Sequence, residues 1–261
     1  MNEPIGASSG ARYRSAVPTD PLAPLLDLAD VAPAFSAAQA KVDDAMRHRA
    51  LRRHGGRVAA EISLRSAVAS AGLEGHAYDL EDVRAGTVTD PVVQGALRIF
   101  SADLADLWLQ APRQALARLH VLAAGGVVPA AELGRPSSAA DRIDALSALV
   151  VGNSAWTTPP MLLAAVVHAE LLTLRPFAGP AGVVARAAAR LTLIGRSFDP
   201  RGLVAADVGH RLREPEYVGA SGAYATGTPD GLRSWLRHYA AAVEAGADEL
   251  ITVGDGVLAA A

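Results

Sequence analysis

Apolar residues recur three and four positions apart along most of this 261-residue chain, and this spacing predicts amphipathic helices. The first run starts near Phe35 and ends at the glycine pair 55–56, which suits a helix C-terminus. Asp90 stands where an N-cap is expected, with Pro91 at the first helical position. Further helices are predicted over 57–75, 79–86, 90–110, 111–126, 140–151, 159–174, 181–197, 214–225 and 228–247. Apart from a short candidate β-arm near 126–137, no segment alternates convincingly, so we predict an all-α fold.

The chain divides into three parts by composition. Residues 1–35 form a predicted flexible N-terminal extension, because its beginning is rich in Ser, Gly, Pro and polar residues. Residues 36–56 form a predicted helix with a basic end, and 57–250 form the main helical domain. No repeat is found, so we expect a single domain.

Composition excludes several kinds of chemistry. The chain has no cysteine, which removes disulfides, thiol nucleophiles and cysteine-based metal sites. The net charge of −3 gives no overall attraction to nucleic acid or to an anionic membrane. The uncharged stretch 145–169 contains Asn153, Ser154, Thr157 and Thr158 and is broken by Pro159-Pro160. Together with a start that lacks the apolar core of a signal peptide, this leads us to expect a soluble, cytoplasmic protein.

Two other polar features have competing interpretations. The run from Arg47 to Arg57 holds five arginines, which fit a docking surface for an acidic partner or the negative end of a helix dipole, and we favour the helix end. His168 and His120 lie among apolar residues and are predicted to be hydrogen-bonded core histidines rather than metal ligands. No H-E-x-x-H or G-x-S-x-G motif is present, so the sequence does not support a zinc protease or a serine hydrolase.

The stretch "RPFAGPAGVVAR", 175–186, has the properties of an anion site. A glycine turn that leads into a helix directs free backbone N–H groups and the helix dipole at one point, and Arg186 can reach the same point from one turn beyond Gly182. The alternative is a helix–helix corner whose arginines face solvent. A dinucleotide-binding loop does not fit, because the preceding segment is predicted as helix and the glycine spacing is wrong.

The same stretch resembles the signature loop of the Fic (Fido) family, "HPFx[D/E]GNGRxxR", whose members mostly transfer AMP from ATP to protein hydroxyls. A second motif lies upstream, where residues 70–75, "SAGLEG", resemble the inhibitory-helix pattern [S/T]-x-x-x-E-[G/N]. The resemblance spans about residues 57 to 245. It implies a single Fic-like helical domain over 57–250, with Ser70 and Glu74 as inhibitory residues.

The signature loop departs from the family where chemistry is done. Arg175 stands in place of the catalytic histidine, and Gly179 in place of the metal-binding acid. The other departures are Pro180, Ala181 and Val183, whereas Pro176, Phe177, Gly182 and Arg186 match the pattern. Arginine has no lone pair for a proton, and a positioned base contributes about 10²–10⁴ in rate, so the resemblance implies a catalytically degenerate member with no catalytic residue. Mg²⁺ is not expected, and no metal ligand is assigned.

The resemblance also implies a control device. In the family the inhibitory glutamate pairs with the second arginine, so we predict an ion pair between Glu74 and Arg186 with Arg175 close by as a second cation. The predicted anion or nucleotide site then comprises Arg175, Gly179, Gly182 and Arg186. No cofactor is assigned, and ATP or another nucleotide is the candidate ligand.

Three functions remain open. The leading one is a non-enzymatic Fic-like protein that binds a protein partner, or a nucleotide or other anion, at this loop. The second is an adenylyltransferase of altered mechanism, and the third is a structural or antitoxin-like interaction module. A protein partner is expected, nucleic acid and membrane are not, and homo-oligomerisation is left open.

Overall fold

The computed structural model describes residues 20–152 and 157–261, and its regular structure in these ranges is helical. The α-helices are α1 (Val31–Ala45), α2 (Ala50–Arg53), α3 (Gly55–Gly72), α4 (Leu80–Arg84), α5 (Pro91–Phe100), α6 (Ala105–Gln110), α7 (Pro112–Ala124), α8 (Ala140–Val151), α9 (Pro160–Leu174), α10 (Ala181–Gly195), α11 (Ala206–Leu212), α12 (Glu214–Tyr224) and α13 (Pro229–Ala259). A short 3-10 helix, Ala23–Asp27, precedes them. The described residues contain no β-strand, so the predicted all-α class is confirmed.

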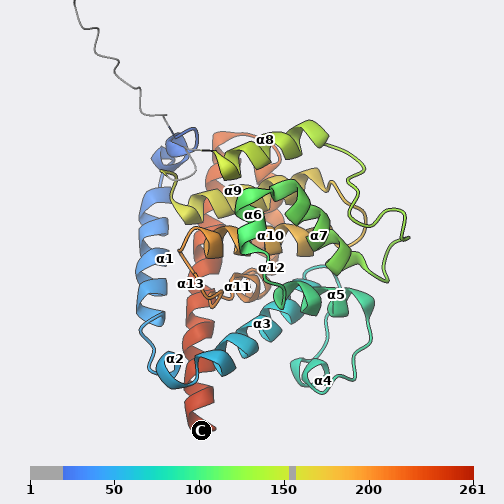
Figure 1. Cartoon of the computed structure of the whole chain (residues 1–261). Helices are drawn as coiled ribbons and strands as arrows, with labels where there is room; N and C mark the ends of the chain where they lie inside the picture. The colour runs from blue at the N-terminus through green and yellow to red at the C-terminus, as the bar shows by residue number, and fades with distance from the viewer. Residues whose placement is uncertain (1–19, 153–156) are drawn as a thin grey trace, which may run out of the picture.

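Two helices run through the centre of the molecule (Figure 1). Helix α9 is apolar on every side and α10 is built mainly from alanine and valine, so both are buried along most of their length. Small side chains let the two helices pack closely against each other. Within the described ranges, no helix combines the length and the apolar character needed to cross a membrane.

The other helices surround this pair in two groups. One hydrophobic cluster joins α9 and α10 to α1, α12 and α13, with Trp235 and Tyr239 among its largest buried side chains. The second cluster joins them to α5, α6, α7 and α8, with Trp108 at its centre. Helix α3 contributes to both clusters, Ile62 to the first and Ala67 to the second. The position of its C-terminal end is therefore held by most of the fold.

Part of the predicted extension 1–35 is helical. The 3-10 helix and the start of α1 lie within it, and residues 1–19 lie outside the described residues. Val31 and Phe35 are buried in the same cluster as α13, because α1 needs that helix to cover its apolar face. The predicted basic-ended helix 36–56 is divided into α1 and α2.

Three other local predictions differ from the structure. The expected helix 90–110 is interrupted after Phe100, where the hydroxyl of Ser101 donates to the Leu97 carbonyl and ends α5. The expected β-arm near 126–137 is a series of turns with a single bridge between Gly125 and Val128. Some of its backbone N–H groups instead bond outside the segment. The Gly134 N–H donates to His120 Nδ1, and the Ser137 N–H donates to the Pro176 carbonyl. The sequence pattern did not predict helix α11.

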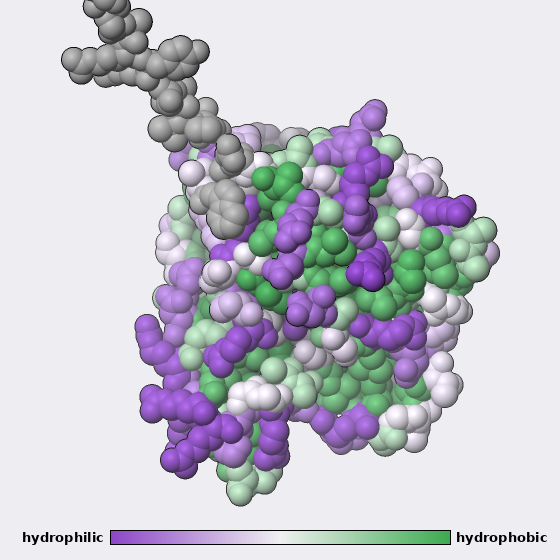
Figure 2. Space-filling view, viewed as in Figure 1, coloured by the Kyte–Doolittle hydropathy of each residue, from purple (hydrophilic) through white to green (hydrophobic). Residues whose placement is uncertain are grey.

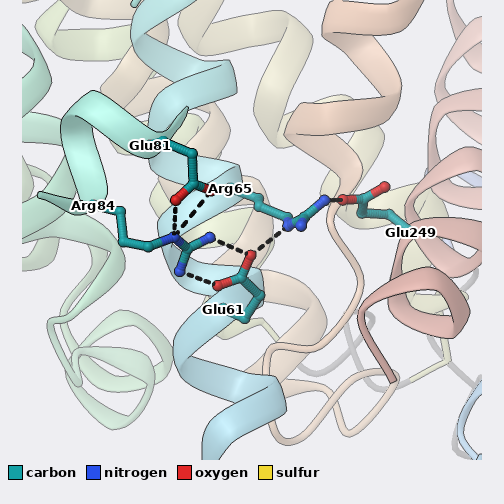
Figure 3. A network of polar contacts seen from close by, with 5 residues as sticks. All are labelled: Glu61, Arg65, Glu81, Arg84 and Glu249. Atoms are coloured by element: carbon teal, nitrogen blue, oxygen red, sulfur yellow. Dashed lines mark hydrogen bonds and ion pairs between the residues drawn. The ribbon is translucent and has the colours of Figure 1, made fainter. Parts of the chain in front are cut away.

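A network of ion pairs attaches α3 to its neighbours (Figure 3). Glu61 accepts hydrogen bonds from Arg65 on the same helix at 2.6 Å and from Arg84 of α4 at 2.6 and 2.7 Å. Arg65 also binds Glu249 of α13 at 2.6 Å, and Arg84 binds Glu81 at 3.2 Å. The network therefore connects the middle of α3 to α4, the next helix in the chain, and to α13, which is distant in sequence.

We expect Glu61→Gln to lower the free energy of unfolding by about 1–2 kcal/mol at pH 7, less than the full pKa shift implies because solvent reaches the network. Hydrogen bonds from Arg84 lower the pKa of Glu61 from 4.5 to about 2. Its stabilising effect is therefore complete above pH 4.5 and is lost as the pH falls towards 2. Urea denaturation at pH 7 and pH 3 should show the difference shrinking to less than about half.

The exposed Glu81→Gln is the matched control and should change stability by less than about 0.5 kcal/mol. An equal loss for Glu61→Gln at both pH values would contradict the linkage.

Candidate functional site: an anion site closed by a carboxylate

The loop between α9 and α10 begins at a residue with unusual backbone geometry. Arg175 ends α9 in the left-handed region, with φ 42° and ψ 56°, and its N–H donates to the Leu171 carbonyl at 3.0 Å. A non-glycine residue in this region is uncommon and is found mainly where a turn is tightly constrained. Gly179 also has a positive φ, of 74°, and its α-carbon lies under Val128, which leaves no room for a side chain.

His120 of α7 anchors this loop. One ring nitrogen, Nδ1, accepts from the Gly134 N–H at 3.0 Å, so Nε2 carries the proton and donates to the Ala178 carbonyl at 2.9 Å. The ring also stacks on Phe177, with centroids 4.7 Å apart. Burial lowers the pKa of His120, which favours this neutral form. The prediction of a hydrogen-bonded core histidine is confirmed.

Arg186, one turn into α10, is a buried cation with partners on several sides. Its side chain is 1% exposed. Nε donates to the Ser70 hydroxyl at 2.8 Å, and Nη1 donates to the Tyr217 hydroxyl at 3.0 Å. Nη2 donates to the Ser70 carbonyl at 2.8 Å and to Glu74 Oε1 at 3.0 Å. The predicted ion pair between Glu74 and Arg186 is present.

The Glu74 carboxylate also occupies the start of α10. A Cβ atom added to Gly182 would lie only 2.0 Å from Glu74 Oε1. Glu74 follows the end of α3, and Gly75 with φ 88° then reverses the chain, as the predicted helix stop requires. Glu74 therefore lies at the positive end of α10, where an anion would be stabilised by the helix dipole.

Arg175 does not join this pair. Its side chain is exposed and forms no ion pair with any residue in the described part of the chain. The expected second cation beside Glu74 is therefore not in contact with it. The left-handed backbone at 175 ends α9 and starts the loop at this exposed position.

Behind Arg186 lies a layer of buried polar side chains that the sequence did not reveal. Asp207 of α11 places Oδ1 3.4 Å from Arg186 Nε. Tyr217 of α12 connects Arg186 to His168, whose Nε2 lies 3.0 Å from the Tyr217 hydroxyl. His168 is thus a core histidine, as predicted. Asp207 and Tyr217 carried no signal, because neither belongs to a motif and α11 was not recognised as a helix.

Burial dominates the ionisation of this layer. It lowers the pKa of His168 well below the ordinary value, with a further contribution from the Arg186 charge, so His168 is neutral. Burial alone would lower the pKa of Arg186, but Tyr217, Glu74 and Asp207 together raise it. Burial raises the pKa of Asp207, and Arg186 opposes that rise.

Most histidine nitrogens around the loop and Arg186 have a polar neighbour. His120 uses both of its ring nitrogens on backbone groups, His168 Nε2 lies beside the Tyr217 hydroxyl, and His210 Nδ1 faces His238 Nε2. Among the described residues, no three His, Asp or Glu side chains are grouped to hold a metal ion. The start of α10 and Arg186 together remain suited to a carboxylate or a phosphate.

Comparison of the structure with solved proteins identifies the fold. It is similar to residues 134–508 of Fic-1 from C. elegans, with a TM-score of 0.67, 19% sequence identity, and coverage of 90% of this chain and 76% of that one. The chain has a Fic fold. The same segment of Fic-1 carrying a glutamate-to-glycine substitution gives the same TM-score, identity and coverage. No protein-family model and no curated protein matches the sequence.

The Fic fold accounts for how the two motifs meet. Residues 70–75 and 175–186 are about a hundred positions apart in the chain, and packing of the end of α3 against α10 brings them together. At 19% identity the likeness establishes the fold, whereas the roles of individual side chains rest on their own geometry.

We expect Gly182→Ala to displace the Glu74 carboxylate from Arg186, because the new methyl group would meet it at 2.0 Å. Glu74 can rotate towards solvent and alanine favours a helix, so the free energy of unfolding should change by less than about 1 kcal/mol. A double-mutant cycle with Glu74→Gln should show a coupling of about 1 kcal/mol, since both substitutions disturb the same contact.

Gly219→Ala on α12, where an added Cβ meets nothing within 4 Å, is the control and should be additive with Glu74→Gln. Additivity at 182, together with an intact Glu74–Arg186 contact in a crystal structure of Gly182→Ala, would disprove this geometry.

Proposed function

We propose that this chain is a non-catalytic Fic-fold protein that binds a protein partner, or a nucleotide or other anion, at the loop before α10, and that Glu74 blocks this site. The proposal rests on one observation: the Glu74 carboxylate lies on the α-carbon of Gly182 and 3.0 Å from Arg186, where an anionic ligand would be held. A ligand must displace Glu74, so the free site is closed by the chain itself.

The proposed loss of catalysis follows from the residues around that site. AMP transfer requires a base to accept the hydroxyl proton as the oxygen attacks phosphorus. Arg175 has no lone pair to offer, and Gly179 has no side chain with which to hold a bridging Mg²⁺. His120 cannot replace the base, because both its nitrogens are hydrogen-bonded to the backbone.

We expect Glu74→Gly to bind nucleotide at least about tenfold more tightly than the wild-type chain, because the substitution removes the competing carboxylate. Isothermal titration with ATP, ADP and AMP measures this directly. Glu74→Gln, which keeps the size but removes the charge, should fall between the two, and Glu74→Gly/Arg186→Ala should not bind. Absence of heat for every nucleotide in every variant would refute the nucleotide part of the proposal.

The position of Arg175 supports a second candidate function, AMP transfer by an altered mechanism. Its side chain is exposed and forms no ion pair in the described part of the chain, so it is free to meet phosphate in a transferase that takes its proton acceptor from the substrate. Incubation of the Glu74→Gly protein with α-labelled ATP, Mg²⁺ or Mn²⁺ and cell lysate distinguishes AMP transfer from binding without catalysis. We expect no transfer, and labelling that is lost in Glu74→Gly/Arg175→Ala would replace our proposal.

We propose a second contact for a protein partner besides the loop before α10: the corner formed by α2 and the start of α3, which Figure 2 shows as strongly hydrophilic. Arg49, Arg52, Arg53 and Arg57 are exposed there and form no ion pair with other described residues. The helix-end interpretation does not cover all of them, because Arg49 is the N-cap of α2 and Arg57 lies in the first turn of α3. Helix dipoles disfavour cations at those positions, which supports a role in docking an acidic protein.

We expect Arg52→Glu/Arg53→Glu to lose a partner that the wild-type chain retains in a pull-down, because reversed charges repel an acidic surface. Arg118→Glu/Arg135→Glu, a reversal of two other exposed arginines, is the matched control and should retain it. Truncation of residues 1–56 is unsuitable, since α1 belongs to the core. Equal retention by wild type and both reversals would exclude this corner as the contact.

A further inference from the structure

Arg186 has a second carboxylate near it, on α11. Asp207, in the first turn of α11, places Oδ1 3.4 Å from Arg186 Nε, and its side chain is 5% exposed compared with 16% for Glu74. Both carboxylates approach the edge of the guanidinium that carries Nε and Nη2. Asp207 is almost fully buried, and Glu74 reaches the surface.

Asp207 is held in the core independently of Glu74. It lies on α11, which packs against α3 and α13. Because an unpaired buried charge is costly, a buried carboxylate beside Arg186 compensates that charge also when Glu74 is displaced.

Most of the contacts of Arg186 are made with residues other than Glu74. Ser70 binds Nε and Nη2, Tyr217 binds Nη1, and Asp207 faces Nε. Tyr217 is in turn held by His168. Glu74 adds one hydrogen bond, from Nη2. If Glu74 leaves, the remaining contacts still orient the guanidinium towards the start of α10.

We propose that Asp207 is the permanent counter-ion of Arg186, that it positions the guanidinium when Glu74 is displaced, and that it limits how strongly the site binds an anion. An incoming phosphate meets a cation whose charge Asp207 already compensates in part. Asp207 is then a positioning and affinity-setting residue, and Glu74 is the removable one. This inference deepens the function proposed above and rests on it for its binding arm.

The binding arm uses the Glu74→Gly protein at pH 8, titrated by calorimetry with ATP and with inorganic tripolyphosphate. Adding Asp207→Asn should raise the affinity for ATP and for tripolyphosphate by about tenfold each. The substitution removes a negative charge near the ligand while keeping the shape of the side chain. Asp103→Asn, which removes an exposed carboxylate between α5 and α6, is the matched control and should leave both affinities unchanged. Unchanged or weaker binding in a folded Asp207→Asn variant overturns the inference while leaving the proposed function intact.

A stability arm decides the question even if no anion binds. Removing a permanent buried counter-ion should raise the unfolding equilibrium constant by about a hundredfold for Asp207→Asn, whereas Glu74→Gln should raise it by less than about fivefold. Urea denaturation of the two single variants at pH 8 gives both values. Equal effects, or a larger one for Glu74→Gln, would overturn the assignment of Asp207. If Glu74→Gly binds neither probe but the stability order holds, the proposed nucleotide function fails and the counter-ion role stands.

Discussion

The buried guanidinium of Arg186 is the constraint around which this fold is organised. A permanent positive charge placed in the middle of a helical core must be compensated by hydrogen bonds and opposite charge, or the fold would not tolerate it. The compensation comes from the end of α3 through Ser70 and Glu74, from α11 through Asp207 and from α12 through Tyr217. The end of α3 and the α11–α12 segment, which are far apart in sequence, therefore have to meet near the start of α10.

The same constraint accounts for how the loop before α10 is held in place. The loop is held by His120, which uses both ring nitrogens on backbone groups, and His168 supports Arg186 through Tyr217. These histidines are structural, and Arg175 ends α9 in a backbone conformation that starts the loop.

Local patterns in the sequence predicted much of the scaffold and part of the site. The helices around α9, α10 and α12 followed from the spacing of apolar residues, and the Glu74–Arg186 pair followed from two motifs. The errors occurred where long-range contacts override local preference. The expected β-arm gives its hydrogen bonds to His120 and Pro176, and the expected extension contains Val31 and Phe35, which are buried by α13.

By itself the sequence determined the helical class and the absence of cysteine chemistry, and it placed Arg175 and Gly179 in the loop before α10. These are properties of single positions and of short-range periodicity. Only the tertiary structure decided that Arg175 faces solvent, that the Glu74 carboxylate lies on Gly182, and that Asp207 lies beside Arg186. The physical reason is that charge compensation in a core depends on which side chains converge in space, and no spacing along one helix encodes a partner contributed by another.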